Sequence, residues 1–215
     1  MGEPVRAAIL AALVDGRALP AGELAFIGRV APPTASFHLR KLIDAALIKV
    51  QRQGKHSYYR LADERVAAVL ESLAALAPVR QPASVRDQGL RFARSCYRHL
   101  AGRLAVEIHR VLFERNWVLA DCETSYRLTD EGRVWCREFG LSLPPRQETV
   151  GKACLDWTER RPHVSGPLGA ALLARLLELR WLARIPETRA VRLTYAGARG
   201  LEQQLGLVRT INNLG

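Results

Sequence analysis

Residues 32–47 read PPTASFHLRKLIDAAL, and this stretch decides the fold. Its two prolines favour a helix start, and Thr34 or Ser36 can cap the first turn. Apolar residues recur at three- and four-residue steps and predict one apolar stripe, formed by Phe37, Leu39, Leu42, Ile43 and Ala46. The opposite face offers hydroxyl and cationic groups suited to phosphates and purine edges, from Thr34, Ser36, His38, Arg40 and Lys41. We interpret the stretch as a helix that reads a DNA major groove.

Two short helices are predicted before this stretch. The first covers residues 3–14, whose apolar residues lie on one helical face, and the second covers residues 23–30. Because a turn containing two prolines separates the second helix from residues 34–47, the pair is typical of a helix-turn-helix.

An extended hairpin is predicted directly after the recognition stretch. β-forming residues fill positions 48–52 and 56–61, with Gly54 at the bend between them. Such a tip can reach a phosphate backbone or a minor groove, so Arg52, Lys55 and His56 are predicted DNA-binding residues. Phe37 of the recognition stretch is also predicted to bind DNA. A solvated turn is the alternative. Residues 62–77 then form a helix whose apolar face requires a partner.

The first 80 residues carry four short motifs in a fixed order: SFHLRKL at 36–42, AALI at 45–48, RQGK at 52–55 and YYRL at 58–61. Together with the order helix, helix-turn-helix, hairpin, helix, these motifs make residues 1–80 resemble the winged-helix repressors of the ArsR/SmtB family. Members of that family are homodimers that insert two recognition helices into a palindromic operator. The resemblance implies that residues 3–14 and 62–77 form the dimer interface.

The chain departs from that family at the usual inducer sites. Metal-sensing members carry paired cysteines on the helix before the recognition helix, where this chain has ELAFI at residues 23–27, and no soft metal can bind there. Other members place Asp and His ligands on the final helix, but residues 62–77 contain no histidine. Both of these inducer sites are therefore absent from the sequence.

The composition predicts a cytoplasmic globular protein with a polyanionic partner. The 215 residues are 48% hydrophobic, and charged residues interrupt every apolar run, which argues against a membrane span or a signal peptide. The formal charge of +11 favours double-stranded DNA as the partner, although its spread over the whole chain also fits an arginine-rich proteome. Four scattered cysteines indicate reduced thiols.

Residues 81–215 contain an internal repeat, with copies at about 90–143 and 153–208. His99 matches His163, and Trp117 matches Trp181, at an offset of 64 residues. Later matches lie at offsets of 65 and 66, as duplication followed by loop drift leaves them. Each copy reads as an apolar helix, a tryptophan, a hairpin and a final helix.

The same order of elements is found in residues 36–76. We therefore predict a mainly α protein with small β-hairpins (α+β), in which a winged helix-turn-helix domain of residues 1–80 precedes a duplicated effector-sensing domain of residues 81–215. A linker is expected at 78–82. The two degenerate winged-helix-like repeats are expected to pack about a pseudo-twofold axis and to sense or assemble, because neither has a basic helix at the recognition position.

The repeat places cysteine and histidine at related positions, Cys96 and His99 before the first copy and Cys154 and His163 before the second. Cys96 and His99, three residues apart on an expected helix, would share a face. Two thiolates and two imidazoles brought together would form a tetrahedral site for zinc or another thiophilic ion. The alternatives are hydrogen-bonding histidines at helix entries beside cysteines buried as small apolar groups, or a redox switch between the two cysteines.

Aromatic and charged residues around that cluster predict a pocket for an anionic or aromatic small-molecule effector, formed by Tyr97, Asp156, Trp157 and Arg160. As a whole, the sequence favours an effector-responsive dimeric repressor bound to a palindromic operator. An architectural DNA-binding protein without an effector is the alternative. A metal-dependent enzyme fused to a DNA-binding module is less favoured, and no enzyme is expected, because the chain lacks a nucleophile elbow, a phosphate loop and a helix with paired histidine ligands.

Overall fold

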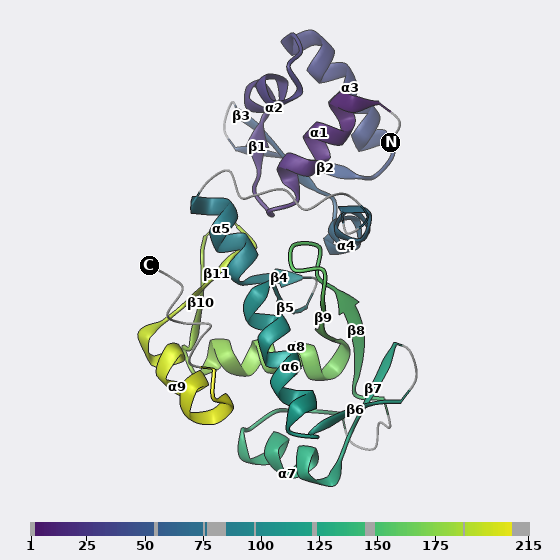
Figure 1. Cartoon of the computed structure of the whole chain (residues 1–215). Coiled ribbons are helices and arrows are strands. Elements are labelled where there is room, and N and C mark those ends of the chain that lie inside the picture. Colours follow the sequence, from purple (N-terminus) through teal and green to yellow (C-terminus); the bar gives the residue numbers. More distant parts are fainter. Residues whose placement is uncertain are drawn as a thin grey trace. The chain divides into compact units, whose positions relative to one another are not determined.

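The computed structural model describes residues 3–53, 56–74, 76, 85–96, 98–121, 124–144, 149–186 and 188–207, so the predicted linker at 78–82 lies outside the described residues. The chain forms two compact units, which are labelled by element in Figure 1. The first comprises Met1–Ala74 with Pro186–Arg189, and the second comprises Ala75–Ile185 with Ala190–Gly215. None of the helices in the described ranges has the length and apolar content that crossing a lipid bilayer requires.

The first unit is a winged helix-turn-helix, as the sequence predicts. Its helices are α1 (Pro4–Leu13), α2 (Ala21–Gly28), α3 (Pro32–Asp44) and α4 (Glu64–Ala74). An antiparallel sheet of order β1-β3-β2 forms the wing, from β1 (Leu19–Pro20), β2 (Ile48–Gln53) and β3 (His56–Leu61). The core consists of apolar side chains from α1, α2 and α3, among them Ile9, Leu10, Leu13, Leu24, Leu39 and Leu42.

The two prolines at the start of α3 decide how this helix begins. Pro32 is its first residue, and Ala31 is the N-cap, with no side-chain cap hydrogen bond among the described residues. The predicted cap from Thr34 or Ser36 is wrong, because both lie inside the first turn and Ser36 Oγ instead donates to Pro32 O at 3.0 Å. Proline has no backbone N–H, so this helix start has fewer donors for a cap to satisfy.

The second unit contains α5 (Val85–Phe92) and two halves that repeat the order hairpin, helix, hairpin, helix (Figure 1). The first half consists of β4 (Arg94–Cys96), β5 (His99–Ala101), α6 (Arg103–Glu114), β6 (Val118–Ala120), β7 (Ser125–Leu128) and α7 (Asp130–Glu138). The second half consists of β8 (Gly151–Leu155), β9 (Pro162–Ser165), α8 (Gly166–Glu178), β10 (Leu182–Arg184), β11 (Val191–Leu193) and α9 (Tyr195–Leu205).

The leading hairpins β4–β5 and β8–β9 are not predicted from the sequence. The expectation that Cys96 and His99 lie on one helix is wrong: they are cross-strand partners, as are Cys154 and His163. The segment between α5, which ends at Phe92, and α6, which begins after Gly102 with a φ of +89°, folds back on itself as a hairpin. Its backbone hydrogen bonds are made between strands instead.

The two halves exchange contacts reciprocally. Helix α6 packs on β9, and helix α8 packs on β5. Strand β8 pairs with β7 of the first half, and Arg94 of β4 forms a bridge with Ala190, the residue before β11. These are the relations that a pseudo-twofold arrangement of the repeats requires, and they bury one continuous apolar core shared by both halves.

The turn from helix to hairpin is built in the same way in three places of the described chain. Helices α3, α6 and α8 are each followed by a residue with positive φ, namely Ala46, Asn116 and Arg180. In each case the next residue donates its N–H to a carbonyl five positions earlier: Leu47 to Leu42, Trp117 to Leu112 and Trp181 to Leu176. The same geometry also follows α2 at Arg29 and α7 at Gly140, so it is a common way to end a helix. The likeness between residues 36–76 and both repeats depends on their shared order of helix, hairpin and helix.

The start of the final helix in each repeat requires glycine. Thr129 and Thr194 cap α7 and α9 by accepting the N–H of Gly132 and Gly197. A Cβ atom on Gly132 would lie 2.0 Å from the carbonyl oxygen of Trp117, and one on Gly197 would lie 2.1 Å from that of Trp181. Backbone occupies the space that a side chain would need.

We therefore predict that Gly132→Ala lowers the free energy of unfolding by about 1–3 kcal/mol or more, because the added methyl group forces the backbone apart. The matched control is Gly89→Ala in α5, where a Cβ would meet nothing within 4 Å and helix propensity should raise stability by about 0.5–1 kcal/mol. Urea unfolding of both variants measures the difference. Equal stability of the two would contradict the close contact at Trp117.

Candidate functional site

Helix α3 presents a polar and cationic face outside the core of the first unit. Thr34, Ser36, Arg40 and Lys41 are exposed, and Phe37 is 57% exposed beside them. The Lys41 ammonium lies 5.8 Å from the centroid of the Phe37 ring, within cation–π distance. These five predicted DNA-binding residues therefore share one accessible surface with the donors that phosphates require.

The predicted apolar stripe of α3 is shifted by part of a turn. The buried residues are Ala35, His38, Leu39 and Leu42, whereas Phe37, Ile43 and Ala46 are exposed. His38 was predicted to face DNA, but its side chain is buried and its Nδ1 lies 3.3 Å from Glu3 Oε2. Because positions 35, 38, 39 and 42 follow the helical period, His38 falls on the core side once Ala35 is inside.

The wing carries the remaining predicted DNA-binding residues. Arg52 is exposed on β2, opposite Ser57 of β3. Lys55 lies outside the described residues, and His56 is described only by its backbone, which pairs with Gln53.

The second unit brings the four predicted Cys and His residues together. The Sγ atoms of Cys96 and Cys154 and one ring nitrogen each of His99 and His163 all lie within 4.8 Å of one another. His99 Nε2 and His163 Nε2 are 3.0 Å apart. Both histidines and Cys96 are buried, and Cys154 is partly buried. The leading hairpin of each half supplies one cysteine and one histidine, which are cross-strand partners: Cys96 with His99 and Cys154 with His163.

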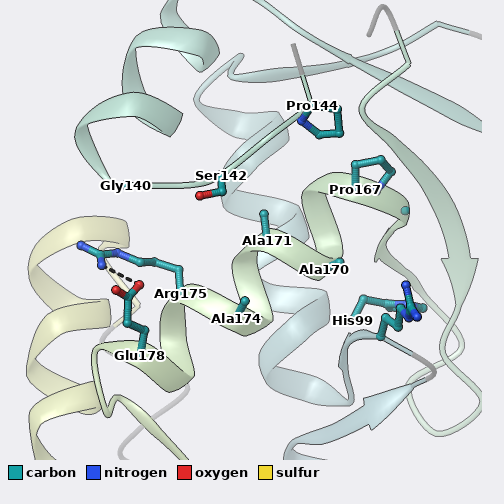
Figure 2. A pocket seen from close by; sticks show the side chains of 12 residues that line it. His99, Gly140, Ser142, Pro144, Pro167, Ala170, Ala171, Ala174, Arg175 and Glu178 are labelled. Atoms are coloured by element: carbon teal, nitrogen blue, oxygen red, sulfur yellow. Dashed lines mark hydrogen bonds and ion pairs between the residues drawn. The ribbon is translucent and has the colours of Figure 1, made fainter.

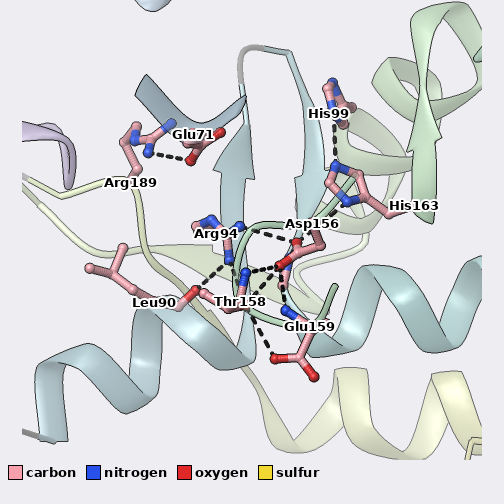
Figure 3. Close-up of polar contacts among 10 residues, drawn as sticks. Glu71, Leu90, Arg94, His99, Asp156, Thr158, Glu159, His163 and Arg189 are labelled. Atoms are coloured by element: carbon pink, nitrogen blue, oxygen red, sulfur yellow. Dashed lines mark hydrogen bonds and ion pairs between the residues drawn. The ribbon is translucent and has the colours of Figure 1, made fainter. Parts of the chain in front are cut away.

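The carboxylate of Asp156 fixes one side of this Cys/His cluster. Asp156 is fully buried, and its Oδ2 lies 3.4 Å from His163 Nδ1 and 3.1 Å from the Arg94 guanidinium (Figure 3). The N–H of Gly102 donates to the same oxygen at 2.6 Å, while the N–H and hydroxyl of Thr158 donate to Oδ1 at 2.9 and 2.7 Å. Each acceptor position of the buried carboxylate is thereby used.

These contacts set the protonation of the site. Burial alone would raise the pKa of Asp156, but the hydrogen bond with His163 and the charge of Arg94 hold that pKa well below its ordinary value. Burial alone would lower the pKa of His163, but its contacts with Asp156 and Cys96 raise it above the ordinary value. Asp156 is therefore a carboxylate whose partner nitrogen on His163 is Nδ1, which leaves Nε2 facing His99.

A pocket of about 570 Å³ lies beside the cluster, since His99 also lines it. Alanines of α8 line one side, and Arg175 pairs with Glu178 at 2.8 Å nearby (Figure 2). Asp156, Trp157 and Arg160, which were predicted to form the effector pocket, are not among the described residues that line it. Asp156 is buried in its own network, and the Trp157 ring lies 5.0 Å from the Arg94 guanidinium. Tyr97 lies outside the described residues.

Two residues that support the cluster were not found from the sequence. Arg94 is 1% exposed and reaches Asp156 across 62 positions, so nothing local in the sequence indicates the contact. Gly169 of α8 lets this helix approach His99, because a Cβ atom there would lie 2.2 Å from Val164 O and 2.9 Å from His99 Cβ. The sequence did contain a signal for Gly169, because it lies in the interior of an apolar helix. Glycine destabilises a helix interior, so its presence there indicates close packing against another part of the chain.

Comparison with known proteins identifies the family. A family model described as a helix-turn-helix domain matches residues 1–51. The uncharacterized HTH-type transcriptional regulator YdfF of Bacillus subtilis (strain 168) is 41% identical over 214 residues, which is 96% of this chain and 94% of that protein. The chain belongs to the HTH-type transcriptional regulators. This regulator's N-terminal unit is the winged helix-turn-helix that its motifs predict. The predicted class, a DNA-binding transcriptional regulator, is confirmed.

Two solved structures are similar to part of this HTH-type regulator. The homodimeric winged helix-turn-helix domain of Mb0332 from Mycobacterium bovis, a possible ArsR-family transcriptional regulator, is 28% identical, with 34% of this chain and 68% of that chain covered and a TM-score of 0.33. The cadmium metal-sensor CMTR of Mycobacterium tuberculosis is 31% identical, with 39% and 88% covered and a TM-score of 0.30.

His109 of α6 gives the second unit a pH dependence that can be measured. Burial lowers the pKa of His109 to about 4, aided by repulsion from His163 and Arg161, and its Nε2 lies 3.0 Å from the Tyr126 hydroxyl. Because the unfolded chain restores a pKa near 6.5, it binds more protons than the folded chain between about pH 6.5 and 4. The folded state therefore loses stability as the pH falls through this range.

We predict that the melting temperature of His109→Gln falls less between pH 7 and pH 4.5 than that of the wild type. The glutamine can keep a hydrogen bond to Tyr126 but does not titrate. Thermal unfolding followed by circular dichroism over this range tests the prediction. Parallel curves for the two proteins would show that His109 does not titrate as its burial requires.

Proposed function

We propose that this regulator is a repressor that binds a palindromic operator as a homodimer, and that an effector weakens or strengthens this binding. The exposed face of α3 carries the proposal: Arg40 and Lys41 project from a helix whose opposite side, at Leu39 and Leu42, is held in the core. A helix fixed in this way can enter a major groove with its donors already oriented.

The outer face of α4 supports dimerisation. Val69 is 56% exposed and Leu73 is 46% exposed, one helical turn apart. A hollow of about 360 Å³ lies beside them, lined in part by Val66 and Leu70. The resemblance implies that residues 3–14 also form part of the dimer interface. In the structure, the apolar residues Ile9, Leu10 and Leu13 of α1 are already buried within their own unit, so less of α1 is available to a second copy than its sequence indicated. An apolar surface on α4 fits a twofold contact with a second copy.

The duplicated second unit is the proposed site of effector response, and no enzymatic role is proposed for it. An effector changes DNA binding only if it has different affinities for the DNA-competent and DNA-incompetent states. The second unit offers a Cys/His cluster and a neighbouring pocket for such a ligand. These groups are distinct from the donors on α3, so sensing and DNA reading use different residues.

We predict that Arg40→Ala and Lys41→Ala each weaken binding to an inverted repeat upstream of the protein's own gene. Each substitution removes about one phosphate or base contact, so the slope of log K against log salt should become shallower by about 0.9. Fluorescence anisotropy at several salt concentrations measures both quantities.

Arg199→Ala on α9 is the matched control, because it removes the same charge from an exposed position of the second unit. Unchanged affinity and slope in Arg40→Ala and Lys41→Ala would contradict the role of α3. Equal wild-type affinity for a scrambled sequence would favour an architectural DNA-binding protein.

We predict that Val69→Asp converts the dimer to a monomer, because two carboxylates would face each other across a desolvated apolar contact. Sedimentation equilibrium measures the mass, and operator binding should weaken because only one half-site can be held at a time. Val134→Asp on α7, where valine is 41% exposed, is the control and should leave the mass unchanged. A wild-type chain that sediments as a monomer at every concentration would overturn the dimer.

A further inference from the structure

We propose that Cys96, His99, Cys154 and His163 bind one Zn²⁺ ion per chain in a closed tetrahedral site that joins the two halves of the second unit. The site lies outside the winged helix, so it is independent of the proposed contacts with DNA. Each leading hairpin supplies one thiol and one imidazole, and the ligands come from positions that the internal repeat relates.

The distances fit a zinc ion. Bond lengths of about 2.0 Å to nitrogen and 2.3 Å to sulfur place the two nitrogens of a tetrahedral site about 3.3 Å apart and the two sulfurs about 3.8 Å apart. In the structure the two Nε2 atoms are 3.0 Å apart, and all four ligand atoms lie within 4.8 Å. Shifts of less than about 1 Å, within the reach of side-chain torsions, bring the set to this geometry.

The histidines present the nitrogens that a metal requires. His163 turns Nδ1 toward the Asp156 carboxylate, which directs Nε2 toward His99. Histidine ligands of zinc commonly donate their second ring nitrogen to a carboxylate, which fixes the ring orientation and strengthens the ligand. Asp156 is itself fixed by Arg94 and Gly102, so it is a positioning residue for His163 and not a ligand.

A divalent cation balances the charge of two thiolate ligands. When Zn²⁺ binds, each thiol releases its proton to solvent and becomes a thiolate, and both imidazoles bind as neutral ligands. Two thiolates and Zn²⁺ sum to zero, which removes the penalty of burying a net charge at a site where Cys96, His99 and His163 are buried. A mixed sulfur and nitrogen set of four suits zinc and leaves no open position for water, as in structural zinc sites.

The test uses the full-length chain, reduced and stripped of metal with a chelator. Titration with Co²⁺ should give one ion per chain, with thiolate-to-cobalt charge-transfer bands and the intense visible bands of a tetrahedral centre. Zn²⁺ should displace Co²⁺ and bleach these bands, and the melting temperature should rise because binding to the folded state stabilises it. Octahedral spectra, or no binding by the wild type, would overturn the proposal.

Variants then assign the ligands. Cys154→Ser replaces the partly buried cysteine, so it should abolish the charge-transfer bands of that sulfur and the one-to-one binding of Co²⁺. Asp156→Asn keeps all four ligands and should weaken the affinity for the metal ion by about 10- to 100-fold. Cys136→Ser is the matched control: Cys136 lies in α7 outside the cluster, and burial raises the pKa of its thiol to about 12.

Circular dichroism of each variant checks its fold, and the wild-type cobalt spectrum decides the proposal even if a variant does not fold. Binding by Cys154→Ser equal to that of the wild type would overturn the assignment of this ligand set. A reduced chain that binds no Co²⁺, but forms a Cys96–Cys154 disulfide when an oxidant is added, would instead identify a redox pair and also overturn the proposal. Neither readout uses DNA, so a failure here is separate from a failure of the proposed operator binding.

Discussion

The second unit depends on one buried carboxylate. Asp156 lies in the turn between β8 and β9, yet it holds Arg94 of β4, the N–H of Gly102 before α6 and the ring of His163. A buried ion pair gains little net stability, because desolvation offsets most of its attraction. Its effect here is positional, since satisfying each acceptor of the carboxylate requires the two leading hairpins to meet in one arrangement.

That arrangement explains why residues 62 or 64 positions apart can act together. The hairpins bring matching positions of the two repeats into contact, and the helices α6 and α8 each cover the other half's strand. The first unit has the same order of helix, hairpin and helix, from α3 through β2 and β3 to α4. One supersecondary unit is thus used once with an exposed polar helix and twice with buried apolar helices.

Much of this fold could be predicted from the sequence, because local patterns determine it. Helical periodicity located α1, α3, α6 and α8. The pairing of Cys96, His99, Cys154 and His163 also followed from the repeat. The leading hairpins could not be predicted, since their strands are three to five residues long and are stabilised by Arg94 and Asp156 across long sequence separations. His38 was misplaced because its polarity outweighed its helical position.

The reciprocal exchange of strands and helices has a consequence for the history of the chain. Because each half covers the other half's strand and supplies half of the Cys/His cluster, neither half has a complete core alone. Two identical copies of a single ancestral half would satisfy each other through the same contacts, with their cysteines and histidines facing across the symmetry axis. Gene fusion of such a homodimer would yield an architecture of this kind, in which covalent linkage frees the copies to diverge, and the acid at Asp156 would then need no counterpart in the first half.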